Sequence, residues 1–157
     1  MEIYTSYFYK VRFMEPHMIP ISTALWDPKW FHNFQKQDYV WLDKRGVFNG
    51  IRAEEFAPHG ECENLCRGPE FCSTKDSSMC EFLKAYRRQL DRLDCEEVLR
   101  RCEILGGRCK EIAHFSKEPI YIFLVHEAPQ NPCSERRIIQ EWFKANGRCV
   151  NEWNEKI

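Results

Sequence analysis

Apolar side chains recur at helical spacing in three stretches of the chain, and each stretch predicts an amphipathic helix. The three stripes are Phe82, Leu83, Tyr86, Leu90 and Leu93; Val98, Leu99, Cys102, Leu105, Cys109 and Ile112; and Ile138, Ile139, Trp142 and Phe143. Ser78 with Glu81 has the spacing of a capping box, which places the start of the first helix there. Asp94 with Glu97 does the same for the second helix. Gly147 suits the C-terminal cap of the third.

Apolar runs outside these stripes predict the β-strands. Residues 3–8 and 21–25 are predicted to be strands near the N-terminus, and residues 148–153 a further strand near the C-terminus. Ile120–Val125 is apolar throughout, which is typical of a strand buried on both faces. Because strands alternate with helices, the pattern predicts an α/β fold. We expect one domain over residues 1–157, a three-layer sandwich with a mostly parallel sheet.

Composition and charge narrow the class of protein. The 157 residues carry a formal net charge of -1, so no overall field attracts nucleic acid or an anionic membrane. The N-terminal stretch lacks the basic and apolar segments of a secretory signal, and no apolar run is long enough to span a bilayer. We therefore expect a cytoplasmic protein that does not bind membranes. In a reducing compartment, its nine cysteines favour metal ligation and thiols over a disulfide framework.

Four of these cysteines fall close together in a polar segment with little apolar material of its own. They are Cys62, Cys66, Cys72 and Cys80, with the spacing C-x3-C-x5-C-x7-C. Four thiolates on one metal would order such a segment, so residues 58–80 are predicted to be a metal-binding insertion. Zinc is the preferred metal. Because the usual C-x2-C knuckle is absent, a [4Fe–4S] cluster is the alternative, and four thiols without a metal are the third reading.

A second candidate site lies in the loop between residues 120–125 and the third helix. Ligands of open α/β sheets bind beyond the carboxyl ends of the strands. Cys133 and Ser134 lie at the start of the helix, where the N–H groups favour an anion or a thiolate. Arg136 and Arg137 add guanidinium groups suited to phosphate or carboxylate. The alternative is a capping loop, with Cys133 packed in a turn and the arginines in solvent.

The first of these readings assigns a role to each residue of the site. Cys133 is the predicted nucleophile or anion anchor, Arg136 the charge clamp, and Glu127 an acid/base or orienting group. Ser6 and Tyr7 leave the first strand at the same edge of the sheet and are predicted to bind the ligand, together with Ser134 and Arg137. The prediction is a protein that binds, or acts on, a phosphate-bearing small molecule or nucleotide.

Both ends of the chain carry motifs that resemble the Domain of Unknown Function 488 family. These are IYTSYF, the PIS strand and the PKW turn near the N-terminus, and VHEAPQNPCSERRIIQEWFKANG near the C-terminus. Glu127 matches the acidic position of the family, Cys133 its cysteine, and Arg136 or Arg137 its basic position. The resemblance implies the fold and the place of the site. This chain has Cys-Ser-Glu-Arg where the family has Cys-His-Arg, so no histidine role is carried over.

Two other classes of protein stay open. One is a nucleic-acid-binding module that uses its tryptophans, Trp26, Trp30 and Trp41, and the basic residues of the first two helices. Acidic residues are interleaved with those basic ones, which favours a solvated face instead. The other class is an iron–sulfur redox or sulfur-handling protein. The remaining helix cysteines, which recur every seven residues at Cys95, Cys102 and Cys109, are predicted to be small buried hydrophobic groups.

Overall fold

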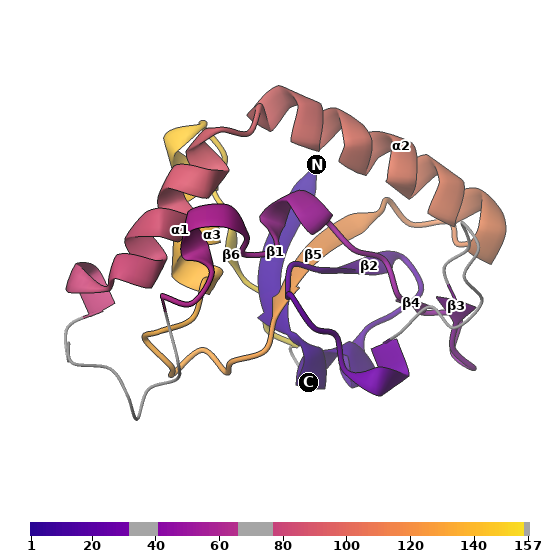
Figure 1. The fold of residues 1–157 in the computed structure, drawn as a ribbon. Helices are drawn as coiled ribbons and strands as arrows, with labels where there is room; N and C mark the ends of the chain where they lie inside the picture. The colour runs from indigo at the N-terminus through magenta and orange to yellow at the C-terminus, as the bar shows by residue number, and fades with distance from the viewer. Residues whose placement is uncertain (32–40, 66–76, 156–157) are drawn as a thin grey trace.

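The fold is built on a four-stranded sheet, seen in a computed structural model that describes residues 1–31, 41–65 and 77–155. Its strands are β1 (Glu2–Tyr7), β2 (Met18–Ser22), β5 (Ile120–Val125) and β6 (Asn151–Glu152). They lie in the order β2-β5-β1-β6, and every pair is parallel (Figure 1). The α/β fold and the parallel sheet predicted from the sequence are therefore confirmed.

The strand register brings three strand ends to one edge of the sheet. Tyr7 lies opposite Val125, and Ser22 lies opposite Leu124. The loops that follow β1, β2 and β5 consequently leave the sheet side by side. In a parallel sheet, this carboxyl edge is where ligands bind.

Strand β2 begins three residues before the stretch that the sequence predicted. Residues 21–25 were expected because Pro20 is a poor strand residue, yet Pro20 lies within β2 and opposite Ile122. An edge strand tolerates a proline, since one side of its backbone is not needed by the sheet, and β2 is at the edge of the strand order. The sequence pattern alone did not reveal that position.

The described residues form three α-helices: α1 (Glu81–Asp91), α2 (Cys95–Ala113) and α3 (Arg136–Ala145). Asp94 caps α2 as predicted, and its side chain accepts a hydrogen bond from the N–H of Glu96. The capping box predicted at Ser78 is wrong. Ser78 lies in the 3-10 turn η6 (Ser77–Met79), and the N-cap of α1 is Cys80, which makes no side-chain capping bond.

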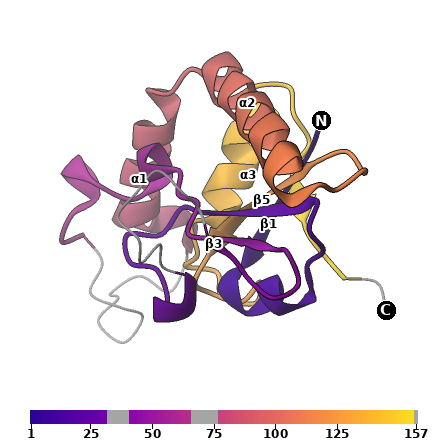
Figure 2. The same cartoon turned by 90° about the vertical axis from the view of Figure 1, so that its right-hand side faces the viewer.

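All three α-helices pack on the same face of the sheet (Figures 1 and 2). Their apolar stripes join Ile3, Ile21 and Phe123 in one core, which also contains Cys102 and Cys109 as expected for small buried groups. Ile122 points to the other face. That face is covered by 3-10 turn η1 (Phe8–Phe13) and by Val47, in the turn between β3 (Trp41–Leu42) and β4 (Phe48–Asn49), whereas Leu42 and Phe48 pack in the first core. The described elements therefore do not confirm a helix layer on each face.

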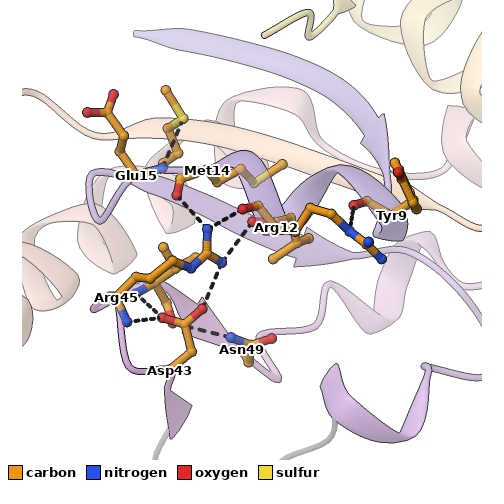
Figure 3. A network of polar contacts seen from close by, with 10 residues as sticks. Tyr9, Arg12, Met14, Glu15, Asp43, Arg45 and Asn49 are labelled. Carbon is orange, nitrogen blue, oxygen red and sulfur yellow. Dashed lines mark hydrogen bonds and ion pairs between the residues drawn. The ribbon is translucent and has the colours of Figure 1, made fainter.

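Arg45 fastens η1 to the hairpin turn on this second face (Figure 3). Its guanidinium donates hydrogen bonds to the backbone carbonyls of Val11, Arg12 and Met14, and forms an ion pair with Asp43 at 2.8 Å. A 3-10 turn leaves its last carbonyls without partners inside the turn, so a guanidinium fork satisfies several of them at once.

No helix in the described part of the chain is long and apolar enough to cross a membrane.

Candidate functional site

A cavity of about 250 Å³ opens at the carboxyl edge of the sheet. Its walls come from the segment after β2, from the 3-10 turn η4 (Gly60–Cys62), from the first turn of α1 and from the loop after β5. The lining residues are Thr23, Ala24, Leu25, Trp26, Pro58, Cys62, Glu63, Asn64, Phe82, Val125, His126, Glu127 and Glu135. We call this space the carboxyl cavity.

Two carboxyl groups face each other in the carboxyl cavity. Glu127 follows the end of β5 by two residues, and Glu135 directly precedes α3. Burial, the negative charge of Glu127 and a hydrogen bond between the two carboxyl groups together raise the pKa of Glu135 to about 8, and burial is the largest of these causes. The pair therefore holds one proton at neutral pH, with a donor on one carboxyl group and an acceptor on the other.

The start of α3 leaves the Glu135 carboxyl available to the cavity. Glu135 occupies the N-cap position but has helical backbone angles and makes no side-chain capping bond. The hydroxyl of Ser134 takes over that task, because it accepts a hydrogen bond from the N–H of Arg136 at 3.2 Å. A residue at this position would otherwise use its carboxylate to cap the helix.

Arg136, the predicted charge clamp, is buried, and its donors are used within the protein. Its Nε donates to Glu152 at 2.6 Å, and a terminal nitrogen donates to the backbone carbonyl of Glu127 at 2.8 Å. Its guanidinium also lies 5.7 Å from the ring centre of Tyr7. Arg136 thus ties strand β6 to the loop that carries Glu127. This geometry makes it a residue that positions the carboxyl pair.

The other residues predicted around Cys133 are placed apart from one another. The N–H of Cys133 donates to the side-chain oxygen of Asn131 at 2.9 Å, and Cys133 does not line the carboxyl cavity. Ser6 is fully buried in β1, and its hydroxyl has no hydrogen-bond partner within the described residues. Arg137 donates to the hydroxyl of Ser77, just before α1, and does not line the carboxyl cavity. The structure therefore brings Glu127 to the cavity and groups Tyr7 with Arg136, while Cys133, Ser6 and Arg137 lie elsewhere.

Two of the four cysteines of the predicted metal site are in the described part of the chain. Cys62 is buried and Cys80 is half-buried, whereas Cys66 and Cys72 lie outside the described residues. Among the residues that the structure does describe, no three His, Cys, Asp or Glu side chains are grouped so as to hold a metal ion. The four-cysteine site stays a prediction.

The described position of Cys62 sets a condition on that site. Its thiol donates to the side-chain oxygen of Gln89 at 3.4 Å, and burial raises the pKa of this thiol. Cys80, at the start of α1, is nine residues before Gln89, which corresponds to about 13 Å along a helix. Zn–S bonds are about 2.3 Å long. For one metal to bind both sulfurs, the thiol of Cys62 would therefore have to give up its hydrogen bond to Gln89.

The basic residues of α1 and α2 lie opposite carboxylates. The ion pairs are Arg87–Asp91, Arg88–Glu61, Arg100–Glu97 and Arg101–Glu97. Each arginine that is paired in this way is less available to a phosphate backbone. Trp26 and Trp30 are exposed, and the side chain of Trp41 lies outside the description. The pairing agrees with the solvated face that the interleaved charges suggested.

Sequence reasoning missed Glu135 and the cavity wall that follows β2. Glu135 was passed over because it is separated from Glu127 by a loop, and only the folded chain shows that the two carboxyl groups meet. Thr23, whose hydroxyl donates to the carbonyl of Leu124 at 2.7 Å, anchors the opposite wall. The one available signal was the position of Glu135 beside a helix start, at the predicted carboxyl edge.

Comparisons with protein-family models, curated proteins and solved structures found no match to this chain. The resemblance to the Domain of Unknown Function 488 family therefore stays a prediction.

Proposed function

We propose that this chain binds a small polar molecule in the carboxyl cavity and transfers protons to and from it. The observation that carries the proposal is the carboxyl pair, which holds a single proton at neutral pH. A protonated Glu135 can donate a proton and a carboxyl oxygen of its neighbour can accept one, the combination that general acid–base catalysis needs. Groups with shifted pKa values in a cavity are characteristic of functional sites.

The rim of the cavity favours a ligand with a flat or apolar part. Leu25 and Trp26 line the cavity and are 53% and 77% exposed, which is unusual for large apolar side chains. Phe82 adds a third apolar wall. A molecule that fits presents an apolar or aromatic body to this rim, and a neighbouring donor and acceptor to the carboxyl pair. The amide-like edge of a nucleobase or a carboxamide has this form.

The carboxyl pair also limits where a phosphate group could lie. Like charges about 4 Å apart repel by about 4 kcal/mol at the effective dielectric near a protein surface. A phosphate-bearing ligand would thus place its uncharged end at Glu127 and Glu135 and its phosphate outside the carboxyl cavity. This moves the reactive centre from Cys133, where the sequence suggested it, to the carboxyl pair.

The test combines a titration with ligand binding. Carbon NMR of the carboxyl groups is expected to show Glu135 titrating near pH 8, and Glu127→Gln is expected to lower that pKa because it removes the neighbouring charge. Adenine, cytosine and benzamide serve as probes of the amide-like edge. We expect their binding to weaken as Glu135 loses its proton, and to weaken in Glu135→Ala.

Two results would overturn the proposal. One is an ordinary pKa for Glu135, because the shared proton would then be absent. The other is a set of probes that bind equally well to the wild type and to Glu135→Ala, or that bind neither. Glu118→Gln is the matched control, since this glutamate is 92% exposed and loses the same charge far from the cavity wall.

For the cysteine-rich segment we infer one metal centre held by its four cysteines, with zinc preferred over a [4Fe–4S] cluster. Their number and spacing support this, as does the place of Cys80 directly before α1. A bound metal would order the segment and add to the stability of the fold. Metal analysis and the visible absorption spectrum of protein purified without air separate the two metals. A protein with neither metal would contradict the inference.

A further inference from the structure

A second cavity, of about 330 Å³, lies between α1 and α3 and is basic where the carboxyl cavity is acidic. Its lining residues are Ser77, Ser78, Cys80, Leu83, Lys84, Arg87, Arg137, Ile138 and Glu141. We propose that this basic cavity binds a phosphate group, either as inorganic phosphate or as the phosphate of a small molecule. The proposal does not depend on the function proposed for the carboxyl pair.

The two helices that form the cavity run parallel, so both begin at the same end of it (Figure 1). Arg137, at the start of α3, contacts Ser77 just before α1, and Arg87, further along α1, lies near Glu141, further along α3. The N–H groups of a first turn have no partners within their helix, and the helix dipole is positive there. Two such ends beside one cavity favour an anion.

Arg137 occupies a position that is unfavourable without an anion. It is the second residue of α3, whose first turn contains no acidic residue. A cation in the first turn of a helix opposes the helix dipole, and a bound phosphate would offset that cost. Lys84 lies in the first turn of α1 beside Glu81, and Arg87 lies in the second turn, so these two side chains only add positive charge to the cavity.

Arg137 has a donor that the described protein groups leave unused. Its terminal nitrogens donate to the hydroxyl of Ser77 at 2.8 Å and to the Ser77 carbonyl at 3.4 Å. Its Nε is buried and has no hydrogen-bond partner among the described residues. The nearest carboxylate, that of Glu141, is 3.6 Å away, which is too long for a hydrogen bond. A buried donor without a partner normally marks a missing acceptor.

Among the described residues of the lining, Glu141 is the one acidic residue, and two arginines share it. Its carboxylate lies 3.9 Å from Arg87 and 3.6 Å from Arg137, so it pairs closely with neither. Glu81, outside the lining, is 3.6 Å from Lys84. The described lining residues thus include three cations and one carboxylate. The Nε of Arg87 donates to Asp91 at 3.0 Å, outside the lining, which leaves the terminal nitrogens of Arg87 for a ligand. A phosphate can contact those nitrogens and Arg137 while Glu141 turns outward, since that side chain is half exposed.

The two cavities are separate although they share the start of α1. Phe82 lines the carboxyl cavity, whereas its neighbour Leu83 lines the basic one. Glu135, directly before α3, lines the carboxyl cavity, and Arg137, on α3, lines the basic one. Variants on one side can therefore be tested without altering the other.

The experiment titrates isotope-labelled protein with sodium phosphate, at constant ionic strength, and follows the backbone amide signals. We expect saturable shifts in the first turns of α1 and α3, and weaker binding by about tenfold or more in Arg137→Gln, because a charge-assisted hydrogen bond is lost. Glu141→Gln is expected to bind phosphate more tightly, because it removes the competing carboxylate. A gain in affinity cannot come from partial unfolding, so this variant guards against a misfolded Arg137 protein.

Phenyl phosphate distinguishes the two sources of the phosphate group. Tighter binding of phenyl phosphate than of inorganic phosphate assigns the cavity to a phosphorylated small molecule, and equal binding assigns it to phosphate itself. Arg100→Gln is the control, because Arg100 is an exposed residue of α2 outside the cavity, and this variant should bind phosphate as the wild type does. Equal phosphate affinity in Arg137→Gln and the wild type, or no saturable binding, would overturn the proposal. Phosphate affinity that is unchanged in Glu135→Gln would show that phosphate binding does not depend on the carboxyl pair.

Discussion

Glu135→Gln should change the dependence of stability on pH in a direction opposite to that of most carboxyl substitutions. The native protein holds the Glu135 proton up to about pH 8, whereas the unfolded chain releases it near the ordinary pKa of 4.5. Between these values the folded state binds more protons than the unfolded state. The free energy of unfolding therefore falls as pH rises through this window, and the full loss is present above about pH 8.

The size of the effect follows from the same two pKa values. Each tenfold change in proton affinity is worth about 1.4 kcal/mol, so the step from 4.5 to about 8 corresponds to at most about 5 kcal/mol. Glu135 is half-buried and water can relax around its charge, so we expect roughly half of that limit. Glutamine carries no titrating proton. Above about pH 8 the variant should therefore be about 2–3 kcal/mol more stable than the wild type.

Urea unfolding followed by tryptophan fluorescence, repeated between about pH 5 and 9, measures this difference. At the acid end the two proteins should be nearly equal, because both carry a neutral side chain at residue 135. Parallel stability curves for the variant and the wild type would refute the reasoning, since Glu135 would then be ionised throughout. Glu118→Gln, which removes an exposed charge, should leave the pH dependence unchanged.

Two further predictions concern α2. Gly106→Ala should lower the free energy of unfolding by about 1–3 kcal/mol, because a Cβ there would lie 2.0 Å from the hydroxyl of buried Tyr121. Gly107→Ala, which has open space around it, should raise the free energy of unfolding by up to about 1 kcal/mol. Equal effects of the two substitutions in denaturant unfolding would contradict this packing. Burial raises the pKa of the Cys109 thiol to about 12. Iodoacetamide should therefore label native Cys109 at least about 100-fold more slowly than exposed Cys149, which mass spectrometry measures. Equal labelling rates would mean that α2 is packed differently.

Helix positions were predictable from the sequence because each apolar stripe needs only local spacing. Their ends were less so: Ser78 had the spacing of a cap, but a 3-10 turn uses it and α1 begins after Cys80. A glycine inside a helix usually only weakens it, whereas Gly106 is the place where α2 approaches the side chain of Tyr121. That contact joins α2 to β5, and the sequence pattern does not show that these two elements lie side by side.

The sequence pointed to the carboxyl edge of the sheet, where the carboxyl cavity opens, but not to the two carboxyl groups that face each other in it. Arg136 was expected to meet a ligand, and instead it donates to Glu152, which lies on β6. No local pattern could reveal that partner, because β6 reaches β1 only through the tertiary fold. The same holds for Glu127 and Glu135, whose common proton depends on burial by α1 and by the segment after β2.

The strand order has a consequence for how the chain folds. β1, the first strand to be synthesised, pairs on one side with Ile120–Val125 and on the other with Asn151–Glu152, and β2 also needs β5. Such distant pairings are slow to form, because a long stretch of chain must first be brought together. During synthesis, β1 and β2 therefore have no partner strand in this sheet until β5 has been made. Folding of the sheet, and with it of both cavities, is expected to come late in synthesis and to depend on chaperones more than the helical content suggests.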